Sequence, residues 1–200
     1  MSEQGVDVGK RRFLTGATAV AGGVGAAFVA VPFIKSWQPS ARARAAGAPV
    51  EVNVSELAPG AKLSVTWRGK PVVIIHRTDE MIASLSEISD NLRDPDSSNP
   101  QQPSYCQNPE RAIKPKYLVM LSLCTHLGCI PDYNASPEAQ PLLKAPGFFC
   151  ACHGSAYDIA GRVYKGVPAP LNMPIPPYRY VADDIILVGE DPTGNGGGTA

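Results

Sequence analysis

Two short segments hold four of the five cysteines and two of the three histidines of this 200-residue chain. The segments are Cys124–Cys129 (C-T-H-L-G-C) and Cys150–Ser155 (C-A-C-H-G-S). Thiolates and imidazoles bind soft and borderline transition metals, and paired thiols also form disulfides. Six such groups in two segments therefore predict a metal centre, a disulfide or both.

The spacing of these residues does not fit a structural zinc site, which usually combines two closely spaced pairs of cysteines or histidines. Each segment instead places a histidine after its first cysteine, Cys124 before His126 and Cys150 before His153. Two cysteines and two histidines can hold a two-iron, two-sulfur cluster, with the thiolates on one iron and the imidazoles on the other. The two cysteines left over could then join the segments through a disulfide.

The segments and the residues after them closely resemble the Rieske iron-sulfur subunits of quinol:cytochrome c oxidoreductases. Tyr157 and Asp158 follow the second segment, and Gly166–Leu171 (G-V-P-A-P-L) matches a proline-containing stretch of these subunits. The resemblance covers nearly the whole chain. It implies an all-β fold, in which an antiparallel β-sandwich head with an inserted cluster-binding subdomain, about residues 121–171, is attached to one N-terminal transmembrane helix.

The resemblance also implies that the cofactor is one [2Fe-2S] Rieske cluster. Its ligands would be two thiolates on one iron and two imidazoles on the other, from Cys124 and Cys150 and from His126 and His153. A disulfide between Cys129 and Cys152 would tie the two cluster loops together.

Two hydroxyl residues, Ser155 and Tyr157, match the family's hydrogen-bond donors to a cluster sulfide and to a ligand sulfur. Such bonds stabilise the reduced, more negative cluster, and neutral imidazoles do the same because they replace anionic thiolates. We therefore expect a reduction potential in the upper part of the range of Rieske centres, roughly −150 to +300 mV.

The same resemblance implies an electron-transfer subunit that oxidises quinol and passes the electron to a c-type cytochrome within a respiratory quinol:cytochrome c reductase. The imidazole of His153 would accept a hydrogen bond from quinol and take its proton while the cluster takes one electron. An apolar rim facing the quinol pocket of a b-type cytochrome subunit would comprise Leu127, Gly128, Pro168 and Pro170. The chain would be active only within this assembly, which we expect to be dimeric.

The remaining histidine and cysteine match no ligand position. His76 follows the apolar run Val72–Ile75 and is interpreted as an ordinary strand-end residue. Cys106 lies in a polar, proline-rich stretch, where a free thiol is the favoured interpretation and an intermolecular contact is the alternative.

The N-terminal segment has the length and composition of a membrane anchor. No charged residue occurs from Phe13 to Ile34, and a helix of this length spans about 33 Å, close to the hydrocarbon thickness of a bilayer. We assign residues 1–12 to a cytoplasmic N-terminus and residues 13–35 to a transmembrane anchor. The alternative is a cleaved signal, because Ala-x-Ala sequences follow at residues 41–45.

Flanking charge does not decide the orientation, because basic residues lie on both sides of the span. The sequence Lys10-Arg11-Arg12-Phe13-Leu14 resembles a twin-arginine export signal, which would carry an already folded domain with its cluster across the membrane. We therefore expect a single-pass protein of the bacterial inner membrane, with its N-terminus in the cytoplasm and its head in the periplasm. A disulfide persists in such an oxidising compartment.

Composition and charge support one exported domain behind the anchor. The hydrophobic content of 44% can supply a sizeable core, and a formal net charge of zero argues against nucleic acid as a partner. Residues 36–48 are expected to form a hinge linker and residues 49–190 the head. The glycine-rich tail, residues 191–200, is expected to be disordered.

Short runs rich in β-branched and aromatic residues, separated by turn residues, predict the strands of the head. These runs are Val50–Val54, Lys62–Trp67, Val72–Arg77, Tyr117–Leu123, Gly147–Cys150 and Tyr180–Val188. A short helix is expected at Asp79–Leu85, where acidic residues occupy the first turn. The polar, proline-rich segment Leu92–Pro115 predicts a surface connection, and Tyr133–Ala145 an insertion that alters the surface beside the cluster.

Other classes of protein remain open at this point. The small Rieske subunit of another exported oxidoreductase, such as arsenite oxidase, also carries a twin-arginine-like signal. A non-redox exported domain stabilised by zinc would contain neither iron nor acid-labile sulfide. A Rieske ferredoxin of an aromatic-ring dioxygenase fits less well, because such ferredoxins usually lack the anchor and the second cysteine of each segment.

Overall fold

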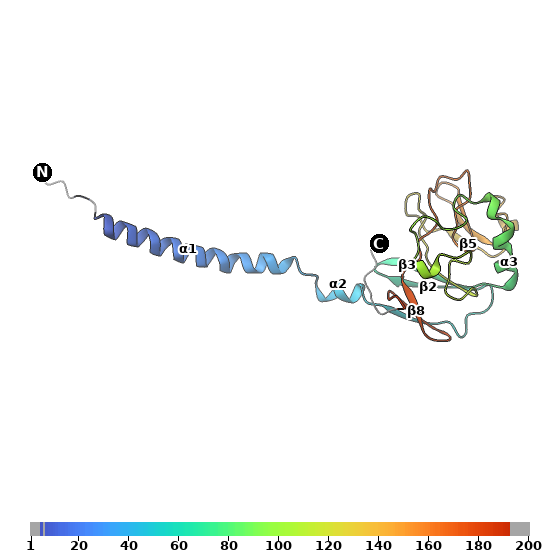
Figure 1. The fold of residues 1–200 in the computed structure, drawn as a ribbon, viewed down its shortest axis with the longest axis horizontal. Coiled ribbons are helices and arrows are strands. Elements are labelled where there is room, and N and C mark those ends of the chain that lie inside the picture. The colour runs from blue at the N-terminus through green and yellow to red at the C-terminus, as the bar shows by residue number, and fades with distance from the viewer. Residues whose placement is uncertain (1–4, 6, 193–200) are drawn as a thin grey trace. The chain divides into compact units, whose positions relative to one another are not determined.

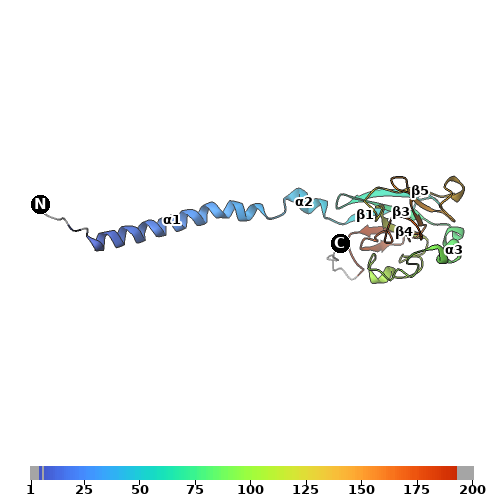
Figure 2. The same ribbon diagram turned by 90° about the horizontal axis from the view of Figure 1, so that it is seen from above.

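The computed structural model describes residue 5 and residues 7–192. The chain divides into two compact units, residues 1–45 and residues 46–200. The first unit consists largely of one long helix, and the second contains all of the described strands (Figures 1 and 2).

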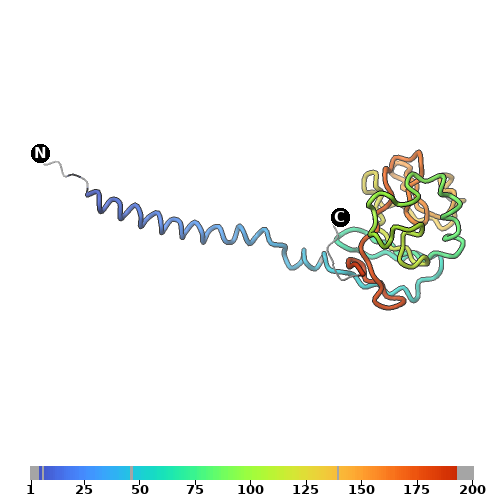
Figure 3. The backbone as a smooth tube through the Cα atoms, in the orientation of Figure 1, coloured from blue at the N-terminus to red at the C-terminus, as the bar shows by residue number. Residues whose placement is uncertain are grey.

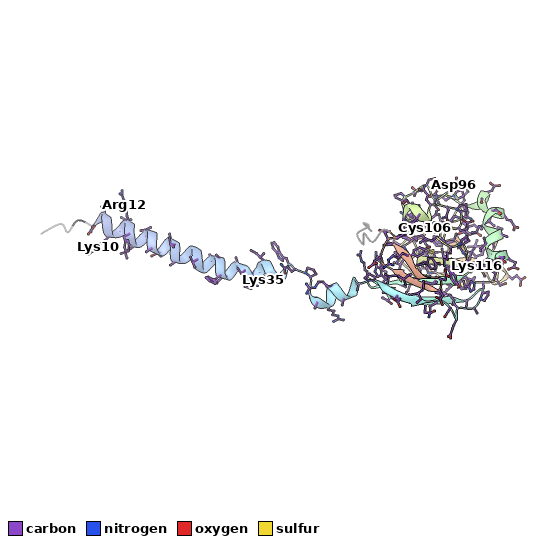
Figure 4. All side chains as sticks on the ribbon, turned by 60° about the horizontal axis from the view of Figure 1, so that its bottom comes forward. Lys10, Arg12, Lys35, Asp96, Cys106 and Lys116 are labelled. Carbon is purple, nitrogen blue, oxygen red and sulfur yellow. A yellow bond between two sulfur atoms is a disulfide. The ribbon has the colours of Figure 1, made fainter. Side chains whose placement is uncertain are left out.

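Helix α1 (Val8–Ser36) contains the charge-free stretch that predicted a membrane anchor. The carboxylate of Asp7 caps its first turn by accepting hydrogen bonds from two backbone N–H groups that would otherwise lack partners. No residue of this helix, which is described in full, is buried, and the helix is long and apolar enough to cross a membrane. Lys10 and Arg12 lie near its beginning and Lys35 at its end (Figure 4), so basic groups flank the apolar stretch on both sides.

In the described part of residues 46–200, nine strands form three antiparallel sheets of three strands each. In spatial order the sheets are β1 (Val50–Asn53), β9 (Ile185–Val188) and β8 (Tyr178–Ala182); β2 (Lys62–Trp67), β3 (Lys70–His76) and β4 (Tyr117–Leu121); and β5 (Asp132–Asn134), β6 (Gly147–Cys150) and β7 (Ser155–Asp158). The predicted all-β class of the head is confirmed.

The sheet β2–β3–β4 places the first cysteine segment. Its central strand β3 carries the continuous buried run Val72–Ile75, which packs into the main hydrophobic core. Strands β2 and β3 are joined by Arg68 and Gly69, whose φ angles of 51° and 72° are those that a two-residue hairpin turn requires. Strand β4 pairs with β3 and ends at Leu121, so Cys124 lies just beyond the edge of a well-packed sheet.

The sheet β5–β6–β7 places the second cysteine segment. Strand β6 ends at Cys150 and β7 begins at Ser155, and these two residues are paired across the sheet. In the chain, this sheet lies between β4 and β8, strands that belong to the two other sheets.

The remaining helices are short. They are α2 (Ala41–Ala46) and α3 (Asp79–Glu87), with the 3-10 turns η1 (Ser89–Asn91), η2 (Ser104–Cys106) and η3 (Pro137–Ala139). The hydroxyl of Thr78 caps α3 by accepting a hydrogen bond from the N–H of Met81, and the predicted helix in this region is confirmed. Helix α2 lies in the predicted linker, where the alanine-rich piece is therefore helical.

Two strand predictions were incomplete. The run Tyr180–Val188 is not one strand but belongs to the hairpin of β8 and β9, with Asp183 and Asp184 in the turn. The prediction missed this turn because the pair lacks the Asn-Gly or Asp-Gly signature of hairpins. Strands β5 and β7 were missed, since one is only three residues long and the other, Ser-Ala-Tyr-Asp, is buried along its whole length and shows no alternation. The predicted tail lies outside the described residues from residue 193 onward.

The prediction of a surface connection at Leu92–Pro115 was only partly right, because buried residues alternate with exposed ones such as Arg93 and Asp96. Cys106, labelled in Figure 4, and Arg111 are both fully buried, and Leu92 is 1% exposed. The guanidinium of Arg111 donates hydrogen bonds to the carbonyl of Ala160 and to the side chain of Gln102. In Figure 3 this green segment runs beside the orange part of the chain, and the hydrogen bond from Arg111 to the carbonyl of Ala160 joins the two.

The segment predicted as an insertion, Tyr133–Ala145, is also part of the packed structure. The hydroxyl of Tyr133 donates to the carbonyl of Gly60 at 2.8 Å. Leu143 and Ala145 are buried in a second hydrophobic cluster together with α3-adjacent residues and the strand β7. The segment therefore connects the sheet of the second cysteine segment to the rest of the head.

Candidate metal centre

The two cysteine segments form loops that close in the same way. In the first, the N–H of Gly128 donates to the carbonyl of Cys124 at 2.9 Å, and in the second, the N–H of Gly154 donates to the carbonyl of Cys150 at 2.9 Å. The two glycines have φ angles of 82° and 77°. No atom lies within 4 Å of a Cβ built on either glycine, so the backbone conformation rather than space explains the residue type.

A disulfide between Cys129 and Cys152 joins the two loops, as the sequence predicted. The N–H of Cys124 also donates to the carbonyl of Cys129 at 2.7 Å, which folds the first loop back on itself. Each loop is therefore fixed internally by main-chain hydrogen bonds and externally by a covalent bond, so the side chains at the loop tips have little freedom to move apart.

The loops bring together the four residues predicted as ligands. Cys124 and Cys150 are free thiols, 3% and 2% exposed. The rings of His126 and His153 meet edge to face with centroids 4.7 Å apart. His126 is half-buried, whereas His153 is exposed.

A test of whether these residues suit a metal is the state of their buried polar atoms. The Nδ1 atom of His126 is buried and has no hydrogen-bond partner among the described residues. A buried polar atom without a partner is costly, and binding a metal would satisfy it. The sulfurs of Cys129, Cys150 and Cys152 lie within 4.8 Å of one another, but two of them are in the disulfide and cannot act as thiolate ligands. Two thiols and two imidazoles remain, which is a Rieske donor set.

The surroundings of Cys124 favour the thiolate. Burial alone would raise the pKa of Cys124, but hydrogen bonds from the Tyr157 hydroxyl and from the N–H of His126 outweigh it and lower the pKa. Burial raises the pKa of Cys150, and the neighbouring Cys124 sulfur adds to this effect. The protein thus stabilises negative charge first on the sulfur of Cys124.

Buried hydroxyls supply the hydrogen bonds around the first loop. The hydroxyl of Tyr157, which is fully buried, donates to the sulfur of Cys124 at 3.2 Å and accepts from the N–H of Thr125 at 3.0 Å. The hydroxyl of Ser155 is also fully buried and accepts from the N–H of Ala169 at 3.1 Å, which leaves its own hydrogen for a further acceptor. The Tyr157 hydroxyl therefore donates to a predicted ligand sulfur, whereas the donor role of Ser155 stays a prediction.

Thr125 is a site residue to which the sequence analysis gave no role. Its hydroxyl donates to the carbonyl of Leu171 at 2.6 Å and lies 3.3 Å from the hydroxyl oxygen of Tyr157. Thr125 therefore connects the first loop to the Gly166–Leu171 stretch and helps to orient the Tyr157 hydroxyl. The signal that could have found it was a hydroxyl residue between the two ligand candidates Cys124 and His126.

The residues predicted as an apolar rim are exposed. Leu127 is 70% exposed, and Gly128, Pro168 and Pro170 are exposed as well. Ile130, which the sequence analysis did not include, is 63% exposed. Large apolar side chains that remain exposed to water on a folded domain are typical of a surface that contacts a partner or a substrate.

A buried ion pair supports the strand that carries Tyr157. The guanidinium of Arg162 donates to the carboxylate of Asp158 at 2.6 Å and to the carbonyls of Leu85 and Pro95. Because these carbonyls belong to α3 and to the 92–115 segment, Arg162 fixes β7 against the rest of the head.

His76 and Cys106 lie outside the two cysteine loops, as predicted. His76 ends β3, and Cys106 is a buried free thiol whose pKa is raised to about 11 by burial.

Comparison with known families gives two matches on different parts of the chain. Residues 101–178 match the Rieske [2Fe-2S] domain, and residues 1–40 match the Ubiquitinol-cytochrome C reductase Fe-S subunit TAT signal. The first match includes all of the ligand candidates, so the cofactor is a [2Fe-2S] cluster and the zinc alternative is set aside. The second match includes the basic residues near the beginning of α1 and supports the predicted export signal.

Whole-chain relatives agree with these matches. The chain is 55% identical over 193 residues to the ubiquinol-cytochrome c reductase iron-sulfur subunit of Allochromatium vinosum, covering 96% of this chain and 93% of the relative. It is 41% identical to the subunit of the same name from Bradyrhizobium diazoefficiens, covering 90% and 94% of the two chains. It is also 41% identical to that of Rhodospirillum rubrum, covering 94% and 96%. The chain belongs to the family of Rieske iron-sulfur subunits of ubiquinol-cytochrome c reductase.

Proposed function

We propose that the chain is the electron-transfer subunit that oxidises quinol in a respiratory quinol:cytochrome c reductase and passes each electron to a c-type cytochrome. The observation that carries this proposal is the pair of joined loops, which contain two free buried thiols, two imidazoles in contact and the exposed apolar residue Leu127. Similarity over nearly the whole chain to named subunits of this enzyme supports the choice over other exported Rieske oxidoreductases.

Four residues would hold the cluster, Cys124 and Cys150 on one iron and His126 and His153 on the other. When bound, a [2Fe-2S] cluster with this ligand set supplies a one-electron acceptor of high potential. Tyr157, with its hydrogen bond to the sulfur of Cys124, would raise that potential because it stabilises extra negative charge on the sulfur. Ser155 would act in the same direction through its free hydroxyl hydrogen.

His153 would take part in the proton transfer. Its imidazole is exposed, whereas that of His126 is half-buried and perpendicular to it. An exposed imidazole can accept a hydrogen bond from the hydroxyl of quinol, take its proton and later release it to water. We therefore assign the catalytic role to His153 and a purely ligating role to His126.

The rim of exposed apolar residues would dock on the b-type cytochrome subunit, where quinol binds. Leu127 and Gly128 come from the first loop, and Pro168 and Pro170 come from the stretch that Thr125 connects to it. Because these residues surround the ligand loops, docking would cover His153 and exclude water while the proton is transferred. The complex is expected to be dimeric.

The N-terminal unit would anchor the chain in the bacterial inner membrane. Helix α1 can cross a bilayer once, and the match to a TAT signal supports export of the head as a folded domain. We infer a cytoplasmic N-terminus at residues 1–12, a span at residues 13–35, a hinge at residues 36–48 and a periplasmic head at residues 49–190. An oxidising periplasm is consistent with the disulfide between the loops.

Electron paramagnetic resonance of dithionite-reduced membranes, combined with a redox titration, tests the proposal directly. We expect the rhombic signal of a [2Fe-2S] cluster with mixed nitrogen and sulfur ligands, titrating at high potential and changing shape when a quinol-site inhibitor is added. Leu127→Ala should remove the response to the inhibitor but keep the signal. A cluster that titrates at low potential and ignores the inhibitor would instead indicate another oxidoreductase, such as an arsenite oxidase.

A further inference from the structure

The free thiol of Cys150 lies beside the disulfide that joins the loops. Its sulfur is within 4.8 Å of both disulfide sulfurs, those of Cys129 and Cys152. Cys150 is buried, Cys129 is half-buried and Cys152 is exposed. This contact has no role in the proposed electron transfer, because a sulfur that is bound to iron is not available for other chemistry.

A cysteine next to a disulfide can exchange with it without any oxidant or reductant. We propose that, in the cluster-free chain, the sulfur of Cys150 attacks the sulfur of Cys129 and displaces Cys152. One S–S bond forms between Cys129 and Cys150 while the original S–S bond breaks. The proton lost by the Cys150 thiol is balanced by the proton that the Cys152 thiolate takes up, so no electron enters or leaves the protein.

The placement of the three residues favours this product over the other possible exchange. Cys150 and Cys152 are separated by one residue, so a bond between them would close a small, strained ring within one loop. A bond between Cys129 and Cys150 still joins the two loops, and the hydrogen bond that closes the Cys150 loop can remain. The displaced sulfur, that of Cys152, is on the exposed side and passes into water.

The neighbouring thiol of Cys124 offers a different reaction, which needs an oxidant. Cys124 and Cys150 are both free thiols, and joining them would remove two electrons and two protons. Exchange with the disulfide requires no such partner and can proceed in anaerobic solution. The two reactions are also distinct in their count, since exchange keeps three free thiols whereas oxidation leaves one.

The exchanged chain would lack the Cys150 ligand and could not bind a cluster at the two loops. This consequence rests on the proposed ligand role of Cys150. It implies that the cluster, once bound, protects the Cys129–Cys152 pairing, and that a chain exported without its cluster would become trapped in an inactive pairing. Cluster loading before disulfide formation would therefore be a requirement built into the spacing of these cysteines.

The test uses the full-length protein in detergent, from which the cluster is removed with an iron chelator under anaerobic conditions. Samples taken over time are quenched in acid, denatured and alkylated with N-ethylmaleimide, and the labelled peptides are quantified by mass spectrometry. We expect the label on Cys150 to fall and the label on Cys152 to rise by the same amount, while Cys106 and Cys124 stay labelled. Cluster-loaded protein, treated identically without chelator, should show no label on Cys152.

Two variants separate exchange from other reactions. Cys150→Ser should abolish the label on Cys152, whereas Cys124→Ser should leave it. The inference is overturned if Cys152 stays unlabelled, if Cys129 is the thiol released, if the number of free thiols falls, or if label spreads over all five cysteines as in an unfolded chain. Its failure would not affect the proposed function, which depends on the resonance signal of the cluster-loaded protein.

Discussion

The two cluster loops share one backbone frame but differ in what surrounds their side chains. In both, a glycine with positive φ donates its N–H to the carbonyl of the first cysteine. In the Cys124 loop the ligand atoms are shielded from water: the Tyr157 hydroxyl donates a hydrogen bond to the cysteine sulfur, and the Nδ1 atom of His126 is buried. We call this the covered loop and the Cys150 loop the exposed loop. In the Cys150 loop, residues 151–153 are exposed.

This difference separates two tasks that a quinol-oxidising site has to combine. Hydrogen bonds in a buried interior act at low dielectric and are stronger than those in water. The covered loop is therefore suited to set the reduction potential of the cluster. The exposed loop offers His153 to substrate and to solvent, so it is suited to accept and release a proton. The disulfide between Cys129 and Cys152 holds the two loops next to each other.

The largest expected effect tests whether the two loops are equal as metal-binding frames. Cys124→Ser and Cys150→Ser should each abolish cluster binding, because an alcohol is a poor replacement for a thiolate on iron. Iron and acid-labile sulfide analysis, with the resonance signal, measures this. Cys106→Ser is the matched control, since Cys106 is a buried free thiol outside both loops and should not affect the iron content.

A smaller effect tests whether Gly128 and Gly154 contribute equally to the stability of the head. Gly128→Ala and Gly154→Ala should each destabilise the head by about 1–2 kcal/mol, because an L-residue in the left-handed region brings its Cβ close to the backbone. Both variants should lower the melting temperature of the cluster-loaded protein by similar amounts in circular dichroism. Leu127→Ala, at an exposed position of the same loop, should leave it unchanged. A loss in only one glycine variant would show that the frames are not equivalent.

The ligand candidates could be predicted from the sequence because metal binding depends on the residue types and on their spacing along the chain, and both can be read without a structure. Strands such as β2 and β6 were predicted within their observed bounds, because β-branched and aromatic residues fit a half-buried sheet. The long helix was predicted for a similar reason, since a charge-free stretch of this length is typical of a membrane span or a signal sequence.

What the sequence could not provide depends on distant parts of the chain. Thr125 gains its role from Tyr157 and Leu171, which lie 32 and 46 positions further along. The segment Leu92–Pro115 is polar and rich in proline, features of a surface loop, yet the head buries part of it, including Arg111, whose guanidinium donates to a carbonyl 49 positions away. Local composition carries no information on such partners.

The covered loop is expected to control the reduction potential. Tyr157→Phe removes the donor to the sulfur of Cys124, so the reduced state loses stabilisation and the potential falls. A net hydrogen bond of ~1 kcal/mol corresponds to a shift of roughly 40 mV for a one-electron couple. Redox titration followed by resonance measures the shift. Tyr133→Phe is the matched control, because the Tyr133 hydroxyl is bonded to the carbonyl of Gly60 rather than to the site.

A polar group added to the exposed loop should have no such influence on the reduction potential of the cluster. Ala151→Ser adds a hydroxyl at an exposed position between the two cysteines of that loop. In water this hydroxyl is solvated, so the potential should stay within a few millivolts of the native value, well under the roughly 40 mV that one buried hydrogen bond contributes. A shift as large as that of Tyr157→Phe would contradict the division between a covered and an exposed loop.

Thr125→Val is the finest test, because it alters the covered loop without touching a ligand sulfur. Valine keeps the shape and the backbone N–H that donates to Tyr157, but loses the hydroxyl that lies 3.3 Å from the Tyr157 oxygen and donates to Leu171. We expect a fall in potential smaller than that of Tyr157→Phe. If Thr125 acts by orienting the Tyr157 hydroxyl, the double variant should titrate at the potential of Tyr157→Phe alone. Additive shifts would instead mean that Thr125 influences the site directly, through the stretch that it holds against the loop.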